Sequence, residues 1–130
     1  MIYRYNKHFT LDEARSYLPQ LKFDMTHIQK SKNQLDEIGF NIYTRKYRPG
    51  FHPDTLTEFP DEFLHLVEVI QTLQNDGVQI KGIEEGLADF PAIRPNGEEV
   101  FLCWKEGEED IHFWHTLDGG YRGRRPIEEF

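Results

Sequence analysis

The sequence predicts an α+β fold, in which an antiparallel two-helix hairpin packs on a small antiparallel β-meander of three to four strands. In the first 76 residues, apolar side chains recur every three or four positions, which is typical of amphipathic helices. From residue 78 they come in short runs separated by turn residues, which is typical of strands. We therefore expect a single domain over residues 1–130, mainly helical over 9–76, with the meander and a tail over 78–127.

The first predicted helix follows Thr10. Thr10 and Glu13 have the spacing of a capping box, in which each side chain binds the backbone N–H of the other residue. An apolar stripe runs over residues 11–38, and Gly39 is expected to end the helix. Pro19 lacks the N–H that a helix interior needs, so it should kink the helix or restart it.

A second helix is expected between Pro60 and Gly77. Proline suits a first helical turn, and the acidic residues after it suit the positive end of the helix dipole. Residues 40–58 connect the two helices and are rich in Pro, Gly and aromatic residues. We expect these rings to pack over the helix ends; the alternative is that the basic residues of this segment bind an anionic ligand.

Residues 87–116 predict three strands joined by two turns. The run Arg94-Pro95-Asn96-Gly97-Glu98 indicates a bulged three-residue hairpin loop, which fixes the pairing of the first two strands. On the face that the helices cover, the expected pairs are Ala88 with Trp104, Phe90 with Leu102 and Ala92 with Val100. On the other face, the expected pairs are Asp89 with Cys103 and Pro91 with Phe101.

The second turn lies in the acidic run 106–110, and its length decides where His115 points. An even loop places Trp114 and His112 on the outer face. The residues that it places under the helices are Ile111, Phe113 and His115. A loop of three instead puts His115 opposite Cys103, because a one-residue shift moves every side chain to the other face. The apolar pattern favours the even loop.

The loop of three would bring Asp89, Cys103 and His115 together. A cysteine with a histidine and a carboxylate is the minimum for an activated thiolate or for three metal ligands. Cys103 would then be a nucleophile or ligand, His115 a base or ligand, and Asp89 an orienting carboxylate or ligand. With the even loop, Cys103 is a small buried hydrophobe, and no metal or other cofactor is expected. His112 lies three residues from His115 on one strand and so points to the opposite face.

Further candidate binding residues lie in the tail and at the two tryptophans. Arg122, Arg124 and Arg125 form the basic cluster of an acidic half, and their planar guanidinium groups suit a small anionic ligand. The alternative is that they neutralise nearby carboxylates. The remaining candidates are Asp118, Trp104 and Trp114, the last two being either ligand contacts or core packing.

Composition narrows the function. A net charge of −8 argues against nonspecific nucleic-acid binding, and no apolar run is long enough for a membrane span. One cysteine and a polar N-terminus favour the cytoplasm. Charge is uneven, at +4 over residues 1–50 and −12 over residues 51–130. This asymmetry, together with an apolar patch expected at Phe101 and Trp114, favours a homo-oligomer.

The leading functional hypothesis is therefore a self-associating binding module in the cytoplasm. The sequence has no P-loop, HExxH, GxSxG or CxxC motif. Two alternatives stay open: an enzyme dependent on a metal or a thiol, centred on Asp89, Cys103 and His115, and an anion-binding module that uses the arginines of residues 122–125. The substrate, ligand and biological process do not follow from the sequence.

Four motifs occur in order along the chain. They are Phe9-Thr10-Leu11-Asp12-Glu13-Ala14 with Leu18-Pro19, Gly86-Leu87-Ala88-Asp89-Phe90-Pro91-Ala92, Leu102-Cys103-Trp104, and Trp114-His115 with Asp118 and Gly123-Arg124-Arg125-Pro126. In these motifs the sequence resembles a family of small bacterial proteins known only as a domain of unknown function. The resemblance is weakest at residues 40–60 and implies no activity. The residues that it implies to be shared are Asp89, Cys103, Trp104, His115, Asp118, Gly123 and Arg124.

Overall fold

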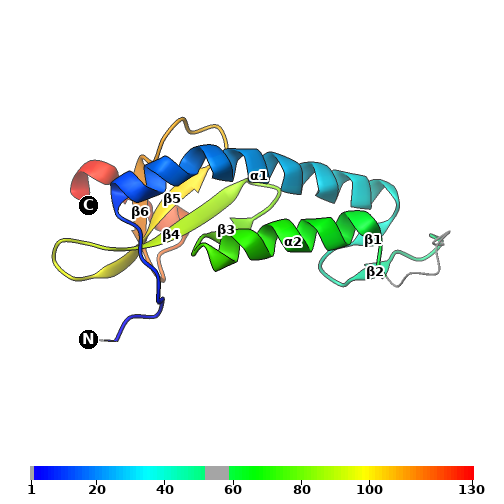
Figure 1. The fold of residues 1–130 in the computed structure, drawn as a ribbon, viewed down its shortest axis with the longest axis horizontal. Coiled ribbons are helices and arrows are strands. Elements are labelled where there is room, and N and C mark those ends of the chain that lie inside the picture. Colours follow the sequence, from blue (N-terminus) through cyan, green and yellow to red (C-terminus); the bar gives the residue numbers. More distant parts are fainter. Residues whose placement is uncertain (1, 52–58) are drawn as a thin grey trace.

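The computed structural model describes residues 2–51 and 59–130, and in these residues it contains two α-helices and two antiparallel sheets (Figure 1). The helices are α1 (Leu11–Glu37) and α2 (Asp61–Asn75). The strands are β1 (Phe40–Asn41), β2 (Lys46–Tyr47), β3 (Gln79–Gly82), β4 (Leu87–Ile93), β5 (Glu99–Lys105), β6 (Phe113–Thr116) and β7 (Arg125–Pro126). Two 3₁₀ turns, η1 (Tyr121–Gly123) and η2 (Ile127–Glu129), complete the described elements.

Helix α1 begins as the sequence predicts. The Thr10 hydroxyl accepts from the Glu13 N–H at 3.0 Å, and the Glu13 carboxylate accepts from the Thr10 N–H at 2.9 Å. The helix ends before Gly39, whose φ of 77° suits glycine. Of the two outcomes expected at Pro19, a kink or a restart, the restart does not occur, because α1 runs on to Glu37 with buried residues on both sides of the proline. Burial of that continuous apolar stripe outweighs the loss of one helical hydrogen bond.

Helix α2 lies beside α1 and runs in the opposite direction, as the sequence predicts (Figure 1). The start of α1 meets the end of α2, where the Tyr17 hydroxyl donates to Asp76 at 2.7 Å. At the other end of the pair, Phe40 packs on Phe63, with ring centroids 5.0 Å apart. Phe40 belongs to the small β1–β2 sheet, which the sequence pattern did not predict. Residues 52–58 of the predicted connection lie outside the described residues. Neither α1 nor α2, the helices of the described part, is long and apolar enough to cross a membrane.

The main sheet has five strands in the order β3-β4-β5-β6-β7, one more than the upper end of the prediction. The additional strand, β7, is two residues long and pairs with the edge of β6. Its sequence, Arg125-Pro126, has no alternating apolar pattern that could have predicted it. The register of β4 with β5 is confirmed, including Asp89 opposite Cys103 and Phe90 opposite Leu102. Gly97, with φ of 90°, closes the predicted bulged loop.

The favoured register of β5 with β6 is wrong. His115 pairs with Phe101 and Trp114 with Leu102, so Trp114 lies under the helices and His115 on the opposite face. His115 therefore points to the face that a loop with an odd number of residues predicts. Its partner on β5, however, is Phe101 and not Cys103. The loop is wider than a tight turn, and Ile111 is buried within it before β6 begins. The apolar pattern of the sequence therefore includes Ile111 as a strand residue, although Ile111 lies in the loop.

Three side chains of α1, spaced seven residues apart, bind the β3–β4 and β5–β6 loops. Seven residues are close to two helical turns, so the three side chains lie on one face of the helix. Their donor–acceptor pairs are Arg15 to the Ile111 carbonyl at 3.0 Å, Lys22 to the Glu109 carbonyl at 2.8 Å and Gln29 to the Ile83 carbonyl at 3.1 Å. The acidic loop therefore takes its shape partly from the first helix.

The sheet face away from the helices is also covered. The N-terminal segment crosses it, and the Glu99 carboxylate accepts from the Arg4 and Tyr5 N–H groups at 2.8 and 3.0 Å and pairs with the His8 ring at 2.7 Å. The Tyr5 ring lies edge-on to Phe101, with centroids 5.3 Å apart. Phe101, on this face, is consequently buried even though it does not belong to the main core.

Candidate metal centre

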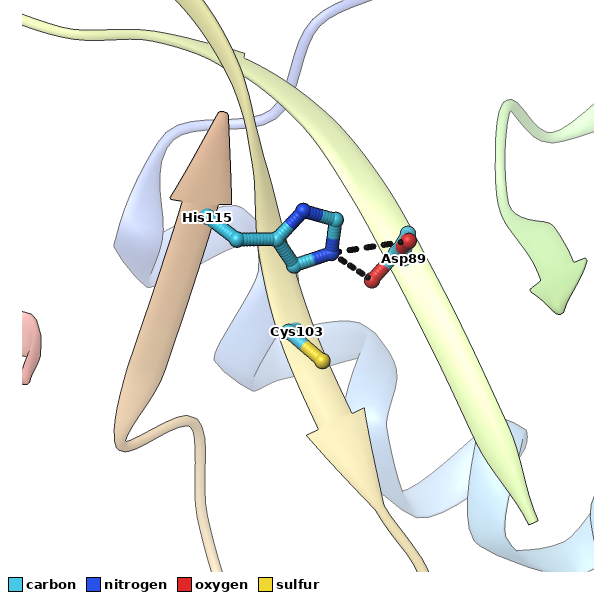
Figure 2. A group of neighbouring side chains, drawn as sticks. All are labelled: Asp89, Cys103 and His115. Carbon is cyan, nitrogen blue, oxygen red and sulfur yellow. Dashed lines mark hydrogen bonds and ion pairs between the residues drawn. The ribbon is translucent and has the colours of Figure 1, made fainter. Parts of the chain in front are cut away.

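Asp89, Cys103 and His115 meet on the face of the sheet away from the helices (Figure 2). They come from three adjacent strands, β4, β5 and β6, and the His115 and Asp89 side chains reach toward each other across β5. All three residues are buried, with exposed fractions of 3%, 1% and 3% in that order. Their ligand atoms lie within 4.8 Å of one another.

The two ring nitrogens of His115 have separate partners. Nδ1 lies 2.7 Å from the Thr116 carbonyl oxygen, and because a carbonyl only accepts, Nδ1 carries a proton and donates. Nε2 lies 3.0 and 3.1 Å from the two Asp89 carboxylate oxygens. Without a metal, this geometry is that of an imidazolium–carboxylate ion pair. Burial alone lowers the pKa of His115, but the hydrogen bond and charge of Asp89 outweigh it and raise the pKa.

The Cys103 thiol is not activated. Burial, with a further contribution from the Asp89 charge, raises its pKa to about 12, so the sulfur is protonated at neutral pH. Arg124 acts in the opposite direction, since its Nη1 lies 3.9 Å from Sγ. A nucleophilic cysteine needs a lowered pKa, so the environment of Cys103 does not fit one. A metal ion would itself displace the proton, because a coordinating thiol is deprotonated.

The three ligand types fit a zinc-class ion. Zn²⁺ binds sulfur at about 2.3 Å and nitrogen or oxygen at about 2.0–2.2 Å, so tetrahedral ligand atoms lie roughly 3.4–3.7 Å apart. In the structure the corresponding atoms lie within 4.8 Å of one another, so the three side chains would have to move closer together to bind the ion. In metal-binding histidines one ring N–H commonly donates to a carbonyl while the other nitrogen binds the metal; the Nδ1 contact of His115 with the Thr116 carbonyl fits this, and Nε2 is the nitrogen that would bind.

A small cavity of about 130 Å³ opens beside Asp89, Cys103 and His115. Besides these three residues, it is lined by Lys81, Leu87, Leu117, Gly120 and Tyr121. A structural zinc site closes its coordination with four protein ligands, whereas a catalytic site keeps one position for water or substrate. Three side chains that could bind a metal, with a cavity beside them, suit the second arrangement better than the first.

Arg124 and Glu108 form a partly buried ion pair next to the sulfur. The two guanidinium nitrogens lie 3.0 and 2.9 Å from the two Glu108 oxygens, and the guanidinium also stacks 3.9 Å from the Phe113 ring centroid. Glu108 is held in turn by the Lys105 N–H, 2.7 Å from its carboxylate. Because both terminal nitrogens of the Arg124 guanidinium already bind Glu108, this arginine is poorly placed to bind a free anion.

The other arginines do not join Arg124. Arg125 lies on the side of the sheet facing Trp114, with its Cζ 5.4 Å from that ring, and Arg122 lies exposed in η1. Asp118 is exposed and pairs with Arg4 at 3.7 Å. The structure therefore does not bring the three arginines into one cluster.

Trp104 and Trp114 both belong to the core, with exposed fractions of 2% and 1%. The Trp104 indole N–H donates to the Glu108 carbonyl at 2.8 Å, and Arg94 lies over Trp114 at 4.3 Å. Phe101 is buried as well, so the apolar patch expected from Phe101 and Trp114 is absent from the described surface. Neither tryptophan reaches the cavity beside Cys103.

Residues 7–127 match the family described as "Uncharacterized conserved protein (DUF2203)". The chain belongs to this family. The match confirms the resemblance to a domain of unknown function, and the family description gives no activity. Comparisons with curated proteins and with solved structures found no match.

Sequence reasoning missed two parts of the site in this DUF2203 protein. Lys81 reaches the cavity because β3 pairs with β4, where Gln79 stands opposite Asp89. The pairing of a strand over 78–83 across the turn at 84–86 could have indicated this. Glu108 was hidden in an acidic run, and nothing in its neighbours distinguishes it as the partner of Arg124.

Proposed function

We propose that this chain is a metal-binding protein in which Asp89, Cys103 and His115 hold one divalent ion of the zinc class. The observation that carries the proposal is the orientation of His115. Its Nδ1 donates to the Thr116 carbonyl, and its Nε2 points toward Asp89 beside Cys103. Three different ligand types at one buried point fit a borderline-soft ion such as Zn²⁺ better than Mg²⁺ or Ca²⁺, which prefer oxygen ligands.

Two features favour a metal over a thiol-dependent enzyme. The buried thiol of Cys103 has a raised pKa, which opposes attack by a free thiolate. The His115 ring binds Asp89 and the Thr116 carbonyl and not the sulfur, so His115 is not placed as the base of Cys103. A metal uses all three side chains at once.

The fourth coordination position faces the cavity. An ion held by three protein ligands keeps a place for water or another small ligand, which is the property that separates a reactive zinc from a structural one. The charges also balance, because a divalent cation neutralises the Asp89 carboxylate and the Cys103 thiolate. The proposal therefore includes a metal with an exchangeable ligand.

Cobalt substitution tests the metal centre directly. We expect the metal-free protein to take up one Co²⁺ or Zn²⁺ per chain and, with cobalt, to develop a thiolate charge-transfer band in the near ultraviolet. Cys103→Ser should remove that band, and His115→Gln and Asp89→Asn should weaken binding by at least about tenfold.

The matched control is His112→Gln, since His112 is exposed on the loop before β6 and is not among the three ligands. It should bind cobalt as the unaltered chain does. Equal binding by His115→Gln, or no uptake of either ion at micromolar concentration, would contradict the proposal.

A self-associating binding module in the cytoplasm is the second proposal. Its support is the charge asymmetry of the chain and the Phe23 side chain on α1, which is 61% exposed. The patch expected at Phe101 and Trp114 no longer supports it, because both residues are buried. Sedimentation equilibrium tests it, and a strict monomer at all concentrations would count against it.

A further inference from the structure

Lys81 carries an unpaired positive charge at the cavity beside the candidate metal centre. Its Nζ lies 4.4 Å from the Phe101 ring centroid, and among residues 2–51 and 59–130 no carboxylate lies within 4.0 Å of it. The other cation near this site, Arg124, is neutralised by Glu108. Lys81 is an exposed residue that lines the same cavity as Asp89, Cys103 and His115.

The cavity limits the size of any ligand. Its volume is about 130 Å³. Drug-sized ligands occupy cavities of about 300–1,000 Å³, so a nucleotide or a peptide side chain with its backbone does not fit inside. The walls are mainly apolar at Leu87, Leu117 and Tyr121, and Gly120 contributes no side chain.

Charge then selects the kind of ligand. A divalent metal with the Asp89 carboxylate and the Cys103 thiolate is neutral, so an anion at the fourth position adds a negative charge. Lys81, on the lining of the same cavity, supplies the opposite charge. An anion placed between a metal and an ammonium in a partly apolar cavity is held more strongly than in water.

We propose that this cavity binds a small oxyanion, of a size between formate and phosphate, as the exchangeable fourth ligand of the metal, with Lys81 as its counter-charge. The proposal rests on the metal centre described above. The proposed anion site therefore lies beside Lys81 of β3, on the sheet face that carries Asp89, Cys103 and His115. It does not lie at the arginines of residues 122–125, where the sequence suggested one.

The test uses the cobalt-loaded full chain and titrates it with sodium formate and with inorganic phosphate. We expect at least one of them to change the visible cobalt spectrum saturably, as replacement of a bound water does. Lys81→Gln, saturated with cobalt before the titration, should bind that anion at least about tenfold more weakly. Lys30→Gln, which removes the same charge from an exposed position on α1, should leave anion binding unchanged.

The outcomes separate the two proposals. A cobalt spectrum that neither anion changes, or a Lys81→Gln variant that binds the anion as tightly as the unaltered chain, overturns the oxyanion site and leaves the metal centre standing. Failure of the unaltered chain to bind cobalt overturns both.

Discussion

At the scale of single residues, the ion pair between Asp89 and His115 controls the protonation of the site. Both side chains are almost fully buried, so the imidazolium depends on the carboxylate for its charge. We expect Asp89→Asn to lower the pKa of His115 below its ordinary value, because burial, which opposes the charged ring, would then dominate. NMR titration of the histidine ring signals in metal-free protein measures this, and an unchanged His115 pKa would mean that Asp89 does not hold the proton there.

The same pair makes stability depend on pH. The folded-state pKa of His115 lies above the ordinary value of 6.5, so its contribution is complete below pH 6.5 and is lost as pH rises through the folded-state pKa. Urea unfolding of metal-free protein should show this decline, and Asp89→Asn should remove it. A decline of the same size in the variant would assign the pH dependence to another group.

At the scale of elements, α1 continues through Pro19 without ending. Burial of the apolar side chains on both sides of the proline outweighs the low helix propensity of proline. Pro19 is exposed and leaves the Arg15 carbonyl without its helical donor. Pro19→Ala should restore that bond and stabilise the protein by about 1–3 kcal/mol in urea unfolding. Ser16→Ala, at an exposed position of the same helix, is the control and should change stability by no more than about 0.5 kcal/mol. A destabilised Pro19→Ala would show that the helix needs a bend at this point.

Glu99 anchors the N-terminal segment on the sheet face that carries Asp89, Cys103 and His115. Its carboxylate accepts from two backbone N–H groups and pairs with His8, and hydrogen bonds to a charged group contribute about 1.5–3 kcal/mol each. Glu99→Gln should therefore speed hydrogen exchange in residues 3–8. Glu98→Gln, which removes the exposed pair with Arg94, is the matched control. Equal exchange in both variants would mean that Glu99 does not anchor the segment.

The same elements show how far sequence reasoning reaches. The helix ends, the β4–β5 register and the Asp89–Cys103 pair follow from local chemistry: a capping box, a glycine at positive φ and a bulged loop. The β5–β6 register does not, because the acidic loop is shaped by contacts from α1 and by Glu108, which is bound to Lys105 and Arg124. Such long-range contacts leave no periodic signal, so the position of His115 could be stated only as one of two alternatives.

At the scale of the whole molecule, metal and protons should compete for one site. Metal binding must displace the Nε2 proton of His115 and the thiol proton of Cys103, whose pKa is raised to about 12, so two protons leave for each ion bound. Metal affinity should consequently rise with pH, by up to about a hundredfold per unit where both groups are protonated. The metal-free protein should become less stable over the same range, for the reason given for His115.

The two trends are opposite in sign, and thermal unfolding between pH 6 and 8.5 can separate them. With EDTA the Tm should fall as pH rises, whereas the increase in Tm caused by excess Zn²⁺ should grow with pH, since the stabilisation by a ligand of the folded state rises with the logarithm of its affinity. Cys103→Ala should abolish most of the zinc-induced increase at every pH, and His112→Gln should keep it. An increase that does not depend on pH would mean that zinc binds somewhere other than at a protonated histidine and thiol.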